Sequence, residues 1–138
     1  VWLGMRSQLG TAQMRRRAFV QMVMPAEYLR THDPASVASQ LAAVFGRDLA
    51  QPEPVVMKQL AAMRAFDGTP LLAALKGTPS LVLSAAHDLL APPSAGRDLA
   101  ERLSARYIEL PDAAHAAPIQ CSERVNELLR EHLLAAAP

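Results

Sequence analysis

One stretch of this 138-residue sequence decides its fold, and it reads Gly77-Thr-Pro-Ser-Leu-Val-Leu-Ser-Ala-Ala-His-Asp88. Its centre, Leu81-Val82-Leu83, is a short continuous apolar run that follows a Thr-Pro turn signal. Such a run is typical of a strand that is buried on both faces of a sheet. The chain leaves this strand through a loop that holds His87 and Asp88, so polar side chains are expected at the strand's carboxyl end.

The residues that follow predict a helix, a second strand and a closing helix. Ser94 is the predicted N-cap of the first helix. Residues 107–110 read Tyr-Ile-Glu-Leu, which predicts a strand that ends at Pro111. The closing helix is expected to turn four apolar residues inward, namely Val125, Leu128, Leu129 and Leu133. Strand, helix, strand and helix at this spacing predict a parallel pair with a right-handed crossover, and hence an α/β sheet.

The first half of the chain reads instead as short helices broken by prolines. Helices are predicted over residues 14–24 and 34–45, and again after Pro54. The second is the best marked, because Asp33 is a good N-cap, Pro34 suits the first helical position and Gly46 supplies the stop. The change of texture near residue 77 therefore separates two subdomains.

Composition excludes several classes of partner. Fourteen Lys and Arg against thirteen Asp and Glu leave a net charge of +1, which gives no basic footprint for nucleic acid. The apolar runs are too short to cross a bilayer. One cysteine, Cys121, cannot build a disulfide framework, so a reducing, cytoplasmic location is expected. No phosphate-cradling glycine motif occurs, which leaves nucleotide cofactors unsupported, and we expect no cofactor. The balanced charge and the short apolar runs predict no nucleic-acid and no membrane partner.

The residues best placed for chemistry are Asp88 and His115. Ligands bind outside the carboxyl ends of the strands in open α/β sheets, and these two residues follow the two predicted strands. A carboxylate can accept the Nδ1 proton of an imidazole and leave Nε2 to take a proton from a nucleophile. Two alternatives remain open. Asp88 is also a common type of turn or capping residue, and His87, Asp88, Asp112 and His115 together offer metal ligands.

Two stretches carry a family resemblance. Residues 77–88, followed by Ala91-Pro-Pro93, resemble the acid loop of the α/β-hydrolase superfamily. Tyr107-Ile-Glu-Leu-Pro-Asp-Ala-Ala-His115, followed by Pro118-Ile-Gln, is similar to its last strand and histidine loop. The match covers about residues 76–134 with the acid before the histidine. The resemblance implies that Asp88 is the triad acid and His115 the general base.

The sequence also departs from the family pattern, because the nucleophile motif G-x-S-x-G is absent. The nearest serine, Ser7, lies between Gly4 and Gly10 at the wrong spacing. We therefore expect residues 1–10 to be the end of a core strand with its loop, 11–76 a helical cap, and 77–138 the C-terminal α/β core segment. The fold class expected is the C-terminal part of an α/β-hydrolase parallel sheet, preceded by the cap and incomplete without the half that holds the nucleophile.

The resemblance implies Ser-His-Asp acyl transfer on a small ester, lactone or related acyl substrate. The serine would come from the missing N-terminal half, and this chain alone would be inactive. An aspartate nucleophile on the same scaffold would give a dehalogenase or epoxide hydrolase. The alternative is a non-catalytic remnant or interaction module that pairs through an exposed sheet edge, with the missing half or a second copy as its partner.

Overall fold

The structure is a computed structural model that describes residues 10–51 and 55–136, apart from the side chain of Met57. The chain divides into two compact units, one of residues 1–22 and 26–69 and the other of Val23–Pro25 and Pro70–Pro138. Nine residues at the start lie outside the described part, so Ser7 and all but Gly10 of the predicted strand end at residues 1–10 lie there too.

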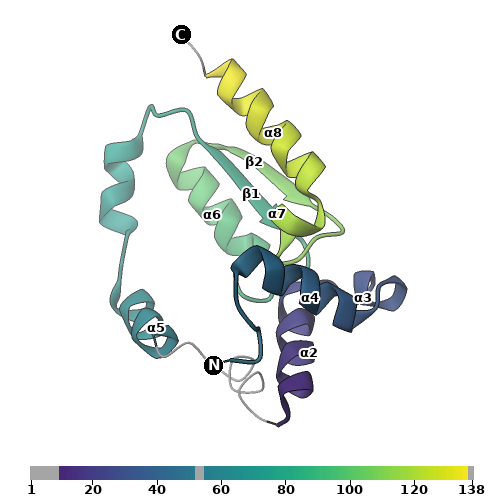
Figure 1. Cartoon of the computed structure of the whole chain (residues 1–138). Coiled ribbons are helices and arrows are strands. Elements are labelled where there is room, and N and C mark those ends of the chain that lie inside the picture. The colour runs from purple at the N-terminus through teal and green to yellow at the C-terminus, as the bar shows by residue number, and fades with distance from the viewer. Residues whose placement is uncertain (1–9, 52–54, 137–138) are drawn as a thin grey trace. The chain divides into compact units, whose positions relative to one another are not determined.

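The described residues before the first strand contain helices alone (Figure 1). They are α2 (Ala12–Val23), α3 (Tyr28–Thr31), α4 (Pro34–Phe45), α5 (Val56–Ala65) and the 3-10 helix η1 (Thr69–Leu75). The prediction for α4 is confirmed at both ends. The Asp33 carboxylate accepts a hydrogen bond from the Ser36 N–H at 3.0 Å, and Gly46 ends the helix with a left-handed φ of 66°.

Buried side chains and contacts made by two arginines hold the helical unit together. Val20 and Leu41 are fully buried. Arg16 of α2 makes two hydrogen bonds to Asp48, Nε to Oδ1 at 2.8 Å and Nη2 to Oδ2 at 2.6 Å. The neighbouring Arg15 donates from Nε to the Ala50 carbonyl at 2.7 Å. Two consecutive arginines thus join α2 to the turn that follows α4.

The second unit contains the predicted strand, helix, strand and helix. Its elements are β1 (Leu81–Ala85), α6 (Pro93–Leu103), β2 (Arg106–Leu110), α7 (Ala117–Gln120) and α8 (Ser122–Ala135). The strands are parallel, with Leu81 opposite Arg106 and Ala85 opposite Leu110. A helix between two parallel strands is the crossover that the sequence predicted.

The two helices α6 and α8 lie on opposite faces of the strand pair (Figure 1). The α6 face of the sheet is polar, since Arg97 of α6 pairs with Glu109 of β2. On the other face, small and branched side chains form the core with the last two helices. The core cluster consists of Ala85, Leu110, Ala113, Ala117, Val125 and Leu128. Alternation along each strand therefore gives the sheet one face on which Glu109 is ion-paired and one face that packs in the core cluster, with an Arg106–Glu131 ion pair to α8 at its amino end.

Two local predictions in this unit are wrong. Ser94 does not cap α6, because the helix begins at Pro93 with Pro92 in the N-cap position, two residues before the predicted cap. A proline at the first helical position has no N–H that needs a partner. On α8, Val125 and Leu128 are buried as expected, whereas Leu129 and Leu133 are exposed, Leu133 to 68%. The described sheet has two strands, so it is too narrow to cover the full apolar stripe of this helix.

Strand β1 keeps one open edge within the described residues. The Ser80 carbonyl accepts from the Arg106 N–H at 3.0 Å, and the Ala86 N–H donates to the Leu110 carbonyl at 3.0 Å. In a parallel ladder the backbone groups of alternate residues point to the same neighbour. Those of Leu81 and Leu83 therefore point away from β2, to the edge where the described part of the chain places no strand.

Candidate active site

The two loops that leave the carboxyl ends of β1 and β2 lie against each other. The His87 N–H in the first loop donates to the Ala113 carbonyl in the second at 2.9 Å. Parallel strands end at the same edge of a sheet, so this contact follows directly from the strand pairing. It brings Asp88 and His115, which are 27 residues apart in the chain, within direct hydrogen-bonding distance.

The Asp88 carboxylate uses its two oxygens for different contacts. Oδ2 lies 2.9 Å from Nδ1 of His115. Oδ1 accepts hydrogen bonds from the backbone N–H groups of Leu90 at 2.8 Å and Ala91 at 2.9 Å. The residue is thus a turn residue and the partner of a histidine at once, so the two interpretations of Asp88 are compatible. The turn fixes the carboxylate, and the carboxylate in turn orients the imidazole.

The electrostatics favour a charged Asp88 carboxylate beside the imidazole of His115. Burial favours a higher pKa for Asp88, but the Ala91 N–H, the His115 side chain and the Leu90 N–H together outweigh burial and hold that pKa below its ordinary value. The Asp88 side chain is only 9% exposed, whereas that of His115 is 44% exposed. With its proton on Nδ1, facing Asp88, a neutral imidazole has Nε2 as its basic nitrogen.

A third side chain, Gln120 of α7, lies beside the histidine loop. Its Nε2 donates to the Asp112 carbonyl at 2.7 Å, and its Oε1 accepts from the Ala114 N–H at 3.2 Å. The sequence pattern includes Gln120 but assigns it no role. Nothing in the spacing shows that a side chain five residues after His115 returns to the residues before it.

Two other candidate groups give no site. Within residues 10–51 and 55–136, no three His, Cys, Asp or Glu side chains lie close enough together to hold a metal ion, so His87 and Asp112 do not join the pair as ligands. Cys121 packs against the core cluster, its thiol donates to the Ala117 carbonyl at 3.1 Å, and burial raises its pKa. A thiol with a raised pKa is a poor nucleophile at neutral pH.

A hollow of about 410 Å³ adjoins the Asp88–His115 pair, and both residues line it. Most of its remaining lining is apolar and comes from β1, α6, α7 and the start of α8, including Val82, Leu99, Ala117 and Val125. A mainly apolar wall with a few polar groups in one place is typical of a small-molecule site.

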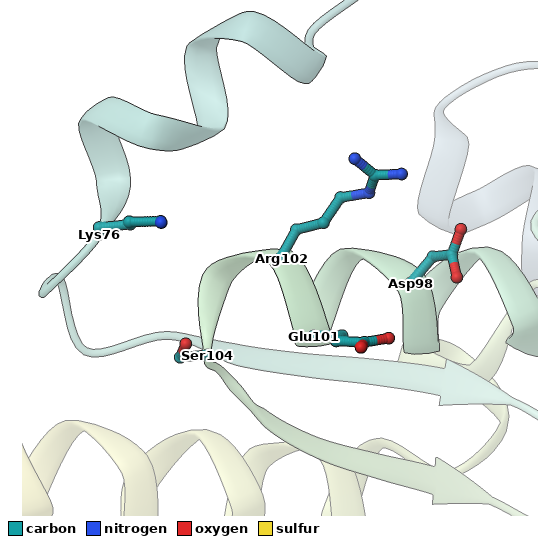
Figure 2. Close-up of a pocket in the computed structure, with 5 residues that line it drawn as sticks. All are labelled: Lys76, Asp98, Glu101, Arg102 and Ser104. Atoms are coloured by element: carbon teal, nitrogen blue, oxygen red, sulfur yellow. The ribbon is translucent and has the colours of Figure 1, made fainter.

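A second hollow, of about 440 Å³, lies at the amino ends of the strands (Figure 2). It is lined by exposed polar side chains, namely Lys76, Asp98, Glu101, Arg102 and Ser104. Two cations and two carboxylates balance each other there, and the loops with Asp88 and His115 are at the opposite ends of the strands. This hollow is therefore not part of the candidate site.

No family model matches the chain. Over 130 residues it is 29% identical to the "Putative carbamate hydrolase RutD" of Klebsiella pneumoniae, a match that covers 94% of this chain and 47% of that protein. The enol-lactonase of Burkholderia xenovorans superposes with a TM-score of 0.71 at 26% identity, over 96% of this chain and 48% of that structure. The thermophilic esterase of Thermogutta terrifontis gives a TM-score of 0.71 at 25% identity, over 99% and 49%.

These likenesses define the class of protein. The chain has the fold of the C-terminal part of an α/β-hydrolase, with an incomplete parallel sheet, as the sequence resemblance implied. It spans about half the length of the relatives it matches. Those relatives are named as hydrolases, among them a lactonase and an esterase. No helix in the described part of the chain has the length and apolar character to cross a membrane.

Proposed function

We propose that this chain supplies the acid and the base of an acyl-transferring α/β-hydrolase that acts on a small ester, lactone or related acyl substrate. One observation carries the proposal: the 2.9 Å hydrogen bond between Asp88 Oδ2 and His115 Nδ1 at the carboxyl ends of two parallel strands. The names of the relatives support the substrate class. A carbamate, an enol lactone and an ester each have a carbonyl carbon that a nucleophile can attack.

In this proposal, each residue has a defined role. A serine hydroxyl attacks the substrate carbonyl while Nε2 of His115 takes the hydroxyl proton. The imidazolium then gives that proton to the leaving group, and a water molecule repeats the sequence to release the acid. Asp88 holds the Nδ1 proton and stabilises the imidazolium by its negative charge. The serine belongs, in this proposal, to the N-terminal half of the complete fold.

The helical residues 11–76 are proposed to form the cap of the same enzyme. A cap excludes water from the reaction and shapes the choice of substrate. The support is the chain order, since the helices precede the acid strand, together with the many apolar side chains that they expose, such as Met14, Val44, Met63 and Phe66.

The test is ester hydrolysis by the complete hydrolase that carries this chain, with 4-nitrophenyl acetate as substrate. Asp88→Asn and His115→Ala should each lower kcat/KM by roughly 10³- to 10⁴-fold, because the members of a triad act as a unit. His87→Ala and Asp112→Asn are matched controls from the same two loops and should stay within about twofold. Unchanged rates in both Asp88→Asn and His115→Ala would end the assignment. The 138-residue chain alone should show negligible turnover.

A second candidate function rests on the open edge of β1. The backbone groups of Leu81 and Leu83 point to that edge, beside the mainly apolar hollow. An unpaired edge of this kind can add a strand from another molecule. The chain would then be an interaction module, and its partner would be the other half of the fold or a second copy. Sedimentation velocity of the chain at rising concentration tests the second copy as partner, because that partner predicts association and a compact monomer at all concentrations contradicts it.

A further inference from the structure

We infer that Gln120 is a positioning residue for His115, whose side-chain amide fixes the histidine loop and so keeps the imidazole in reach of Asp88. The inference rests on the proposed function, since it concerns the same pair of residues. It adds a third side chain to the site, and one that does not touch the reacting atoms.

The side-chain amide of Gln120 binds two backbone groups of the histidine loop. Gln120 donates to the Asp112 carbonyl at 2.7 Å and accepts from the Ala114 N–H at 3.2 Å. These two backbone groups lie three residues and one residue before His115. A carboxamide carries a donor and an acceptor on one carbon, so it can serve both groups at once. A carboxylate can serve only the N–H, and an alkyl chain serves neither.

The backbone that Gln120 binds at Ala114 is buried. Ala114 is only 2% exposed, so solvent has little access to the backbone at this point. A buried N–H that loses its acceptor costs more free energy than an exposed one, because water cannot replace the lost bond. Without the Gln120 oxygen, the loop would have to shift in order to find another acceptor or water. Such a shift would occur at the residue directly before His115.

Few other contacts restrain the position of the His115 side chain. Its side chain is 44% exposed, so packing restrains the ring only weakly. Backbone hydrogen bonds also hold the loop. The Ala113 carbonyl accepts from the His87 N–H, the Ala114 carbonyl accepts from the Ala117 N–H, and the Ala116 N–H donates to the Val23 carbonyl, each at 2.9 Å. None of these bonds involves the Asp112 carbonyl or the Ala114 N–H, and these two groups are the ones that Gln120 binds. A displacement of about 1 Å at a catalytic group can cost 10²-fold in rate.

The experiment uses the ¹⁵N-labelled 138-residue chain and measures, by NMR, which imidazole nitrogen of His115 carries the proton in the neutral ring. Unsubstituted chain should show the Nδ1–H form. Gln120→Met, which keeps the length of the side chain and loses both hydrogen bonds, should lower the ratio of the Nδ1–H to the Nε2–H form at least tenfold. It should also speed amide exchange at Ala114. Gln120→Glu keeps the acceptor and should give a ratio between the two.

Two further variants serve as the controls of this experiment. Gln40→Met is the matched control, since Gln40 is an exposed glutamine on α4, and it should leave the His115 signals unchanged. Asp88→Asn should move the proton to Nε2. If Asp88→Asn changes the ratio and Gln120→Met does not, the role of Gln120 is overturned and the proposed function stands. If neither changes it, the pair itself is refuted. Should Gln120→Met unfold the chain, Gln120→Glu decides, and a ratio equal to that of the unsubstituted chain overturns the inference.

Discussion

The two units of this chain are stabilised in different ways. In the α/β unit, a parallel ladder fixes the backbone, and small residues such as Ala85 and Ala117 pack closely around Leu128. In the helical unit, α5 has no described side chain that is fully buried, and Met63 is well exposed. A partly exposed ion pair between Arg16 and Asp48 joins α2 to the turn after α4 in this unit.

This difference shows which unit can hold two side chains at a fixed hydrogen-bonding distance. Asp88 and His115 are positioned by backbone that the sheet fixes, so their hydrogen bond is a consequence of the fold. The described side chains of α5 offer apolar surface without such restraint. If the proposed function holds, the sheet would position the reacting groups, and the less restrained helical unit could change with the substrate.

The largest expected effect on stability is in the core of the α/β unit. Leu128→Ala removes a fully buried side chain from the core cluster and should lower the free energy of unfolding by about 2–5 kcal/mol. Leu133→Ala on the same helix is the control, because Leu133 is exposed, and its effect should stay within about 0.5 kcal/mol. Urea unfolding of both variants measures the contrast. Equal losses would show that α8 is buried on a different face.

The next effect tests the close approach of α6 to β1. A Cβ on Gly96 would lie 2.0 Å from Oγ of Ser84, but 3.3 Å from its Cβ. Gly96→Ala should therefore cost about 1–3 kcal/mol through overpacking, in spite of the better helix propensity of alanine. Ser84→Ala in the same molecule removes the clashing oxygen and should restore most of the loss. A double-mutant cycle measures this coupling, and strict additivity of the two changes would contradict it.

The smallest effect is a pH dependence of the helical unit. Hydrogen bonds from Arg16 and from the Ala50 N–H lower the pKa of Asp48 from 3.8 to about 2. A group whose pKa is depressed by folding stabilises the fold above its unfolded pKa and loses that stabilisation as the pH falls. Stability should thus decline between about pH 4 and pH 2, with a shallower slope in Asp48→Asn. Circular dichroism melts across this range measure the slope, and identical slopes would refute the pairing.

The sequence predicts the order of elements and the pairing of Asp88 with His115, because both follow from local patterns. An apolar run with turn signals defines β1, and residues after parallel strands meet at one edge of the sheet. The exposure of the Leu129 and Leu133 side chains could not be predicted from the sequence. Their spacing shows an apolar stripe on α8, but whether that stripe is covered depends on the width of the sheet beside it.

The role of Gln120 lies beyond the sequence for a related reason. Gln120 donates to the carbonyl of Asp112, eight residues earlier, and this bond depends on the path of the chain between the two residues. No single residue type in that segment predicts its path. The predicted N-cap of α6, Ser94, lies two residues after the observed one, Pro92. Serine is the preferred N-cap residue type, whereas Pro93 suits the first helical position because its φ is fixed.

The central claim is that Asp88 holds His115 as a general base with its proton on Nδ1. The most direct test is the ¹⁵N spectrum of the His115 imidazole in the neutral ring, recorded for the unsubstituted chain and for Asp88→Asn. The claim predicts the Nδ1–H form in the first and the Nε2–H form in the second. The Nε2–H form in both would contradict it, because Nε2 would then have no lone pair with which to take a proton from a nucleophile.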